Sequence, residues 1–246
     1  MITVAEIDAA DAVKLVLKNH YSPVMPRLTK VYLGAFHDGR LVGALTLGWG
    51  TRPRHTIQNL FPSLETRDYL EIGKMCLIDE MPTNSESQFL AGVLRWMKIN
   101  LKHVCFLFTW ADGTLGKPGY VYQASNFFYG GYIWTDTYLT QNGERIHPRT
   151  MGSRPSLSYL SEHRIKHIRG KLFRYIYPLN RQATKLLDTS TVSWSRDGDI
   201  YPKATSLSWQ ENTVHGWRTL TTKPEFNLQF VEVNSRNIER SLQLAA

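Results

Sequence analysis

Residues 69–110 read YLEIGKMCLIDEMPTNSESQFLAGVLRWMKINLKHVCFLFTW, and three structural elements follow from this pattern. Tyr69–Ile78 predicts a long strand. Val104–Trp110 is nearly all apolar and predicts a strand near the centre of a sheet. Between them, residues 83–88 hold two overlapping capping-box patterns, Thr-x-x-Glu and Ser-x-x-Gln, which open a helix with its apolar residues on one face. We therefore expect a sheet covered by helices.

Elements on both sides extend this pattern. The fold class that they predict is α/β (α+β), with a mixed central sheet, helices on both faces and a small β-rich C-terminal appendage. We expect residues 1–180 to form the main domain and residues 181–246 to form the appendage. The predicted elements are a helix over Val4–Lys18 that ends near Asn19, a hairpin of Val31–Phe36 and Leu41–Leu47 around an Asp-Gly turn, a polar loop with Pro53 and Pro62, a helix over Tyr120–Tyr129 stopped by two glycines, strands at Tyr132–Leu139 and Leu172–Pro178, and short strands at Thr191–Trp194, Ser206–Trp209 and Leu228–Val233.

Composition excludes several classes of protein. Of the 246 residues, 42% are hydrophobic, which is enough for a real core and argues against intrinsic disorder. The longest apolar runs fall far short of the roughly 20 residues that a membrane span needs. No basic-then-apolar leader opens the chain, since Asp8 and Asp11 lie in its first turns. Cys76 and Cys105 lie in apolar runs and are interpreted as buried free thiols, which suits the cytoplasm.

Positive charge is concentrated in the second half of the chain. Residues 1–140 carry 13 Lys and Arg against 12 Asp and Glu, whereas residues 141–246 carry 16 against 9. Residues 163–185 contain seven of these cations and no acid. Such a block is either a solvated face or a surface for a polyanion, because neutralising phosphates is the usual reason to gather cations. The candidates for nucleic-acid binding are Arg164, Lys166, Arg169 and Lys171.

Four segments have chemical character. His20 and Tyr21 follow a predicted helix, Lys74 lies within a strand, residues 82–87 lead into a helix, and Asp112 ends a strand beside a glycine-rich loop. Free amides at a helix start attract anions, and the end of a central strand is where open α/β sheets present ligands. Capping, turn formation and solvent exposure are the alternative explanations of these segments, although capping does not account for Ser87. Familiar zinc, hydrolase and nucleotide motifs are absent from the sequence.

Taken together, these segments resemble a known family. Their order, with His20-Tyr21, Leu41–Leu45, Asn84–Ser87, Ala111-Asp112 and Tyr122–Asn126, is similar to the Mom family of bacteriophage DNA-modification proteins. The resemblance covers about residues 1–180. It implies a GNAT-like acyltransferase fold and an enzyme that modifies bases in double-stranded phage DNA inside the host cell. The modification implied is an acyl or carbamoylmethyl-type group on an exocyclic amine, that of adenine, which protects the DNA from restriction.

The resemblance also implies roles for individual residues. An acyl-CoA such as acetyl-CoA would bind in the splay beside Tyr69–Ile78, and iron is a further possible cofactor. His20 could accept a proton near neutral pH. Tyr120, Tyr122 and Phe127 could stack on a base drawn out of the duplex, although packing explains these rings too. The candidate catalytic residues are His20, Asp112, Tyr122 and Ser125, the candidate coenzyme-binding residues are Lys74, Asn84, Ser85 and Ser87, and the candidate iron ligands are His20 and Asp112.

Three functions remain open from the sequence. The first is a DNA base-modifying transferase, the second a GNAT enzyme that acts on a small amine or a protein, and the third a DNA-binding phage protein without catalysis. The basic segment favours nucleic acid over a small amine. The polar groups at the expected ligand edge favour an enzyme over a binding protein.

Overall fold

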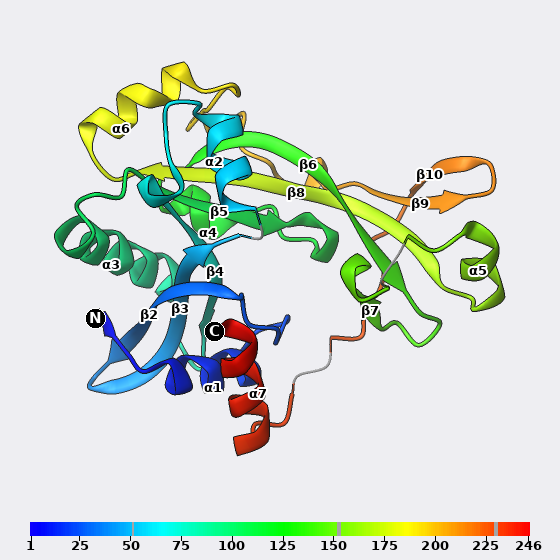
Figure 1. The fold of residues 1–246 in the computed structure, drawn as a ribbon, viewed down its shortest axis with the longest axis horizontal. Coiled ribbons are helices and arrows are strands. Elements are labelled where there is room, and N and C mark those ends of the chain that lie inside the picture. Colours follow the sequence, from blue (N-terminus) through cyan, green and yellow to red (C-terminus); the bar gives the residue numbers. More distant parts are fainter. Residues whose placement is uncertain (51, 152–153, 229–230) are drawn as a thin grey trace.

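One ten-stranded sheet runs through the computed structural model, which describes residues 1–50, 52–151, 154–228 and 231–246 (Figure 1). Its strand order is β1-β2-β3-β4-β5-β8-β6-β7, and β9 pairs with β8 and with β10. β4 and β5 run parallel, and the other strand pairs are antiparallel. The strands are β1 (Ile2–Glu6), β2 (Leu28–His37), β3 (Arg40–Trp49), β4 (Tyr69–Leu77), β5 (Phe106–Asp112), β6 (Phe128–Leu139), β7 (Arg145–Ile146), β8 (Lys166–Pro178), β9 (Trp209–Thr213) and β10 (Gly216–Leu220).

Helices cover both faces of this sheet, as the sequence predicts. α3 buries Phe89 and Val93 in one core, which also contains Leu107 of β5 and is flanked by α4. On the other face, Phe106 and Phe108 of β5 pack with α2 and α6, while α1 and α7 pack together nearby. The helices are α1 (Ala9–Asn19), α2 (Pro53–Leu60), α3 (Ser85–Asn100), α4 (Tyr120–Ala124), α5 (Leu157–Glu162), α6 (Arg181–Leu186) and α7 (Ser235–Ala245), with a short 3-10 turn η1 at Thr66–Asp68.

The sheet opens between its two parallel strands. β4 and β5 pair only from Tyr69 and Phe106 to Glu71 and Phe108. Beyond this point β4 stays paired with β3, and β5 stays paired with β8. The two strands therefore diverge beyond Glu71 and Phe108, and their facing backbone edges are not paired with each other. This opening is called the splay below. With α1, the β2–β3 hairpin, β4, α3, β5, α4 and β6 in this order, the topology is the GNAT-like one that the resemblance implies.

A bulge in β4 lies where the strands part. The register with β3 shifts between Lys74 and Ile72, which leaves Gly73 as the extra residue. A Cβ at Gly73 would lie 2.5 Å from the ring of Pro26, so only glycine fits this close approach. The backbone N–H of Lys74 donates to the Thr46 hydroxyl at 2.9 Å. The bulge thus sets the direction of the Lys74 side chain.

Several sequence predictions need correction. Val4 belongs to β1 rather than to a helix, because residues 2–6 pair with β2 and α1 begins only at Ala9. The helix expected over Tyr120–Tyr129 ends at Ala124, and β6 begins at Phe128. The Gly130-Gly131 pair does not stop a helix but forms an irregularity within β6, where the register with β8 shifts.

Other differences lie in the loop after β3 and in the C-terminal quarter. The expected loop at Pro53 contains α2, because Pro53 suits the first helical turn and Ile57 and Leu60 are buried. The predicted strand Ser206–Trp209 begins only at Trp209, and no strand forms at Thr191–Trp194. Part of the predicted strand Leu228–Val233 lies outside the described residues.

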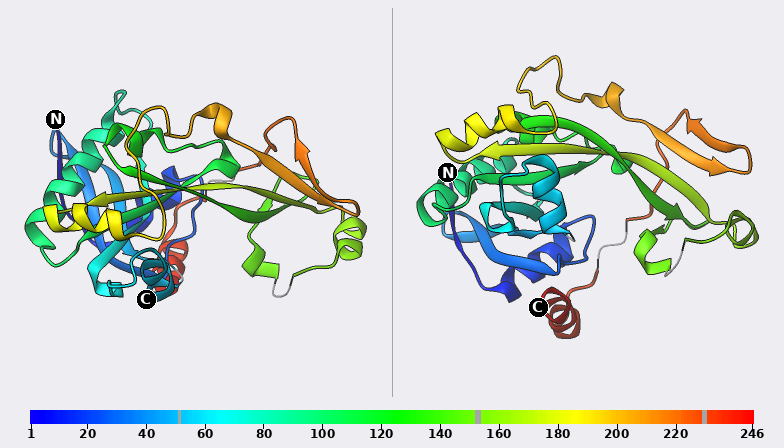
Figure 2. Two further views of the ribbon diagram at one scale, coloured as in Figure 1. Left: turned by 90° about the horizontal axis from the view of Figure 1, so that it is seen from above. Right: turned by 45° about the horizontal axis from the view of Figure 1, so that its top comes forward.

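The strand predicted to start at Leu172 begins at Lys166, so β8 is longer than expected. Its first half joins β7, β9, β10 and the end of β6 in an extension of the sheet. Residues 132–146, 166–172 and 209–220 form this extension, called the arm below. Residues 1–50, 52–131 and 173–196 are called the body. The arm reaches away from the helices of the body (Figures 1 and 2). The C-terminal α7 lies back at the body, against α1.

Candidate functional site

Predicted site residues gather around the opening between β4 and β5. His20 caps the end of α1, Lys74 follows the bulge in β4, and Asp112 ends β5. The charges of Asp112 and of Arg145 in β7 both influence the pKa of Lys74. The charge of Lys74 in turn influences the pKa of His20. The splay therefore brings together side chains from four separate elements.

His20 and Lys74 share the loop that follows α1. The backbone N–H of Ser22 donates to Nδ1 of His20 at 2.9 Å, and Nζ of Lys74 donates to the carbonyl and hydroxyl oxygens of Ser22, each at 2.9 Å. Burial, and then the charge of Lys74, lower the pKa of His20 to about 3. Burial, and then the charge of Arg145, lower the pKa of Lys74 to about 8. His20 is thus neutral at physiological pH and a weaker base than the sequence suggests, whereas Lys74 titrates close to neutrality.

Asp112 is held by Arg145 and Thr114. Nη1 of Arg145 donates to Oδ2 of Asp112 at 2.9 Å, and Nη2 donates to the Thr114 hydroxyl at 3.1 Å. The backbone N–H of Thr114 donates to Oδ1 of Asp112 at 3.0 Å, and the Thr114 hydroxyl donates to the same oxygen. Sequence reasoning missed Arg145, because no local pattern marks it and the antiparallel contact of β7 with β6 carries it to the site. The carboxylate is fixed in place and keeps its charge paired.

Tyr21 connects both sides of the splay. Its ring lies 4.2 Å from that of His20, and Nζ of Lys117 lies 4.3 Å from its centroid. Burial, followed by the charges of Asp112 and Tyr122, raises the pKa of Tyr21 far above its ordinary value. The phenol therefore stays protonated and can donate a hydrogen bond. Tyr122 comes from α4 on the opposite face, and it packs against Phe127 and Tyr175.

Iron does not fit this donor set. Both oxygens of Asp112 already accept hydrogen bonds, and the cations Lys74 and Arg145 lie around the carboxylate. A further cation there would meet like charges. Within residues 1–50, 52–151, 154–228 and 231–246, no group of three or more His, Cys, Asp or Glu is placed to bind a metal ion.

The predicted coenzyme-binding residues at the start of α3 behave differently from the expectation. Asn84 occupies the N-cap with a left-handed φ of 69° and makes no side-chain cap, so neither predicted capping box forms. Ser85 is buried, and the Ser87 hydroxyl donates to the Asn84 carbonyl at 2.9 Å. The first amides of a helix have no carbonyl partner within the helix, and this is the general feature that attracts anions. The charge of Glu86 acts on Lys117, so the helix start lies near the site.

Three further predicted residues are buried or hydrogen-bonded within the protein. Ser125 ends α4, and its buried hydroxyl has no hydrogen-bond partner in the described part of the chain. Phe127 is fully buried in the core, so it is not available to stack on a base. Tyr120 is exposed, and its hydroxyl accepts a hydrogen bond from the backbone N–H of Ala204.

The structure places the four predicted DNA-binding cations in different settings. Arg164 precedes β8 in a left-handed turn with φ 51°, and Lys166 starts the strand. Arg169 and Lys171 lie within the strand and contact aromatic rings. Of the two cysteines, Cys76 is buried and Cys105 half-buried, and both are free thiols, as predicted. The described residues contain no helix long and apolar enough to cross a membrane.

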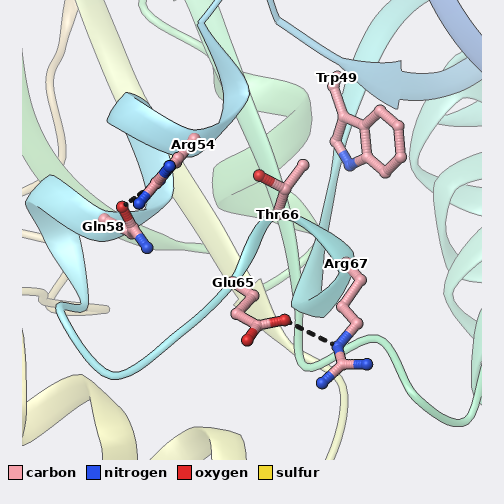
Figure 3. Close-up of a pocket in the computed structure, with 6 residues that line it drawn as sticks. All are labelled: Trp49, Arg54, Gln58, Glu65, Thr66 and Arg67. Atoms are coloured by element: carbon pink, nitrogen blue, oxygen red, sulfur yellow. Dashed lines mark hydrogen bonds and ion pairs between the residues drawn. The ribbon is translucent and has the colours of Figure 1, made fainter.

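A separate hollow of about 440 Å³ lies between α2 and η1 (Figure 3). Arg54 donates to Gln58 at 3.1 Å, and Arg67 pairs with Glu65 at 3.0 Å, so both arginines have partners within the protein. Trp49 lines the same hollow and donates to the carbonyl of Tyr69 at 3.0 Å. None of the candidate site residues lines it.

Comparison with known proteins decides the family. The model of the Mom protein family matches residues 1–196. The chain belongs to the Mom protein family. One relative, methylcarbamoylase mom of Escherichia phage Mu, is 31% identical over 182 residues, which cover 71% of this chain and 74% of the relative. Residues 197–246 lie outside the match to the Mom family model, and they include β9, β10 and α7.

Solved structures with a similar chain path are acetyltransferases. An aminoglycoside acetyltransferase AAC(6')-Ib in complex with coenzyme A and kanamycin covers 75% of this Mom-family chain and matches over 98% of its own, with 10% identity and a TM-score of 0.44. An N-acetyltransferase from Staphylococcus aureus Mu50 covers 73% of this chain and matches over 99% of its own, with 14% identity and a TM-score of 0.41.

Proposed function

We propose that this protein modifies bases in phage DNA by transferring an acyl or carbamoylmethyl-type group to an exocyclic amine, that of adenine. The observation that carries the proposal is the splay of β4 and β5, with Tyr21, Lys74 and Asp112 at its opening. Membership of the Mom family and the relative named methylcarbamoylase support the same chemistry. The modification would protect phage DNA in the cytoplasm of the host cell.

The splay suits an acyl-CoA donor. The facing edges of β4 beyond Glu71 and of β5 beyond Phe108 leave backbone groups that an amide-containing chain can bind. The amides that begin α3 suit the phosphates of the coenzyme. Acyl-CoA, when bound, would supply an activated acyl group. The residues that would hold the coenzyme are those at the start of α3 and along the diverging edges of β4 and β5.

The residues around the splay have separable roles in this reaction. Asp112, fixed by Arg145 and Thr114, would accept a hydrogen bond from the exocyclic amine and orient it. Tyr21 keeps its proton and would donate to an oxygen on which negative charge develops. Lys74, with a pKa of about 8, would accept the proton that the amine loses as its nitrogen bonds to the acyl carbon and the carbon–sulfur bond of the thioester breaks. The proton held by Lys74 would then neutralise the thiolate that leaves. A base must leave the duplex to reach these groups.

Mass spectrometry of nucleosides tests the proposal. DNA from cells that express the protein should contain a modified nucleoside that empty-vector cells lack. Asp112→Asn should lower its amount at least about 100-fold, because the substituted amide cannot keep the pairing with Arg145. Asp188→Asn, at an exposed carboxylate, is the matched control and should leave the amount unchanged.

Calorimetry with acetyl-CoA separates chemistry from binding. Asp112→Asn should bind the coenzyme as the wild type does. If DNA from cells that express the wild-type protein contained no modified nucleoside, the proposal would be contradicted. That result would favour a DNA-binding protein without catalysis. A protein that acetylates small amines and leaves DNA unmodified would instead support the alternative GNAT activity.

A further inference from the structure

Side chains in the first half of β8 alternate between two faces of the arm. Gly170 faces the candidate site, since a Cβ there would lie 2.5 Å from the side chain of Thr114. Lys166, four residues earlier in the strand, lies on the same face as Gly170. Arg169 and Lys171 have the opposite parity and lie on the other face. The arm therefore carries its two aromatic-contacting cations away from the Asp112–Arg145 pair.

Arg169 is enclosed on three sides. Its guanidinium carbon lies 3.9 Å from the ring centroid of Trp217 and 4.8 Å from that of Trp134. Its Nε donates to Oε1 of Gln210 at 2.7 Å. Its two terminal nitrogens have no hydrogen-bond partner among the residues that the structure describes. Three neighbours thus fix the guanidinium and leave its terminal donors available to a ligand.

Lys171 continues the same surface. Its Nζ lies 4.5 Å above the ring of Tyr132, which is 45% exposed, and donates to the carbonyl of Ser206 at 2.9 Å. Tyr132 in turn meets Trp134 edge-on at 6.0 Å. The surface of Tyr132, Trp134, Arg169, Lys171 and Trp217 is called the arm strip below.

Neither cation of the arm strip forms an ion pair with an acid in the described part of the chain. Asp136 lies opposite Arg169 in the register of β6 and β8, yet its Oδ1 approaches Nε2 of His167, at 3.4 Å. Aromatic rings attract a cation without cancelling its charge. Arg169 and Lys171 therefore remain positive charges that can pair with an anion.

Trp217 and Gln210 come from beyond residue 196, outside the match to the Mom family model. They belong to the hairpin of β9 and β10, which joins the sheet at the edge of β8. Two of the three groups that hold Arg169 are therefore supplied by the C-terminal hairpin. The charges of Arg218 and Glu211 in the hairpin offset each other, because the two side chains form an ion pair at 2.7 Å.

We propose that the arm strip binds the phosphate backbone of DNA, with Arg169 as a two-pronged phosphate ligand and Lys171 as a second cation. The choice of DNA as the partner rests on the proposed function. A guanidinium matches a phosphate with two parallel N–H donors, which an ammonium cannot reproduce. Because Trp134, Trp217 and Gln210 already fix the side chain, little conformational freedom is lost on binding. The C-terminal hairpin is then part of the DNA-binding surface.

Fluorescence anisotropy of a labelled DNA duplex over a series of salt concentrations tests the proposal. Arg169→Gln should weaken binding about 10-fold and reduce the slope of log affinity against log salt by about 0.9, which is the loss of one phosphate contact. Lys166→Gln is the matched control, since it removes the same charge from the same strand on the other face. It should change affinity less than about twofold.

Two charge-preserving variants sharpen the test. Arg169→Lys should keep the salt slope and still bind several-fold more weakly, because the two-pronged contact is lost. Trp217→Ala should do the same by releasing the guanidinium, whereas Tyr159→Ala, at an exposed ring on α5, should have no effect. Thermal unfolding of each variant confirms that it is folded.

The outcomes separate this proposal from the proposed function. Equal effects of Arg169→Gln and Lys166→Gln, or none from either, would overturn the role of the arm strip, whether or not DNA is modified. Binding that follows the predicted pattern in a protein that never modifies DNA would leave the arm strip standing and refute the transferase. A wild type that does not bind DNA would refute both.

Discussion

The two halves of β8 make opposite use of the same backbone. From Phe173 to Pro178 the strand lies between β5 and β6 in the body, and Phe173, Tyr175 and Ile176 are almost fully buried. From Lys166 to Lys171 the strand runs through the arm, where Arg169 and Lys171 contact aromatic rings and remain partly exposed. A single strand can therefore supply stability with one half and a binding surface with the other.

The largest expected effect on stability tests this division of β8 into a core half and a surface half. Phe173→Ala should lower the free energy of unfolding by about 3–5 kcal/mol, because it leaves a cavity in the core. Lys171→Ala, two residues away on the same face, should lower it by less than about 1 kcal/mol. Urea denaturation measures both. Equal losses would mean that the two halves of β8 contribute alike to stability.

Gly170→Ala tests whether the arm half also supports the candidate site. The new Cβ would meet the backbone and side chain of Thr114, which holds Asp112. Crowding of this kind should cost about 1–3 kcal/mol of stability and lower the yield of modified nucleoside. Gly198→Ala, where nothing lies within 4 Å, is the matched control. A variant with wild-type stability and yield would show that the contact with Thr114 is not needed.

The smallest effect on stability concerns the body, at the half-buried Glu71 where β4 and β5 part. Burial raises the pKa of Glu71 to about 7, so the folded protein holds a proton that the unfolded chain releases near pH 4.5. The folded state is therefore disfavoured as pH rises from about 4.5 to 7. Glu71→Gln should gain about 1–2 kcal/mol over the wild type at pH 8, and the gain should vanish near pH 4.

Denaturation at several pH values measures this difference. Glu6→Gln, at an exposed carboxyl in β1, is the control and should show no such trend. A gain for Glu71→Gln that stays constant with pH would reflect packing rather than the proton.

Much of the body was predictable from sequence because the signals of its main elements are local. The Asp38-Gly39 turn, the apolar run of β5 and the one-sided helix α3 each reveal themselves within a few residues. His20, Lys74 and Asp112 were found because each lies at an element that the pattern already marked. The family resemblance supplied the reason to connect them.

The arm was not predictable in the same way. Residues 163–171 carry so many cations that charge hid the alternation of a strand. At the junction between body and arm, Gly130-Gly131 suggested the end of a helix although the pair forms an irregularity in β6. Arg145 reaches Asp112 only through the pairing of β6 with β7 and β8. Such contacts depend on long-range register, which a local pattern does not contain.

The alternation of β8 has a consequence for how this chain can vary in length. Gly170 must face Thr114 while its neighbours Arg169 and Lys171 face the arm strip. Losing or gaining one residue between Lys166 and Leu172 would exchange the two faces, directing the cations at the site and moving the glycine away from the threonine. Evolution or a protein engineer can therefore lengthen or shorten this segment only two residues at a time.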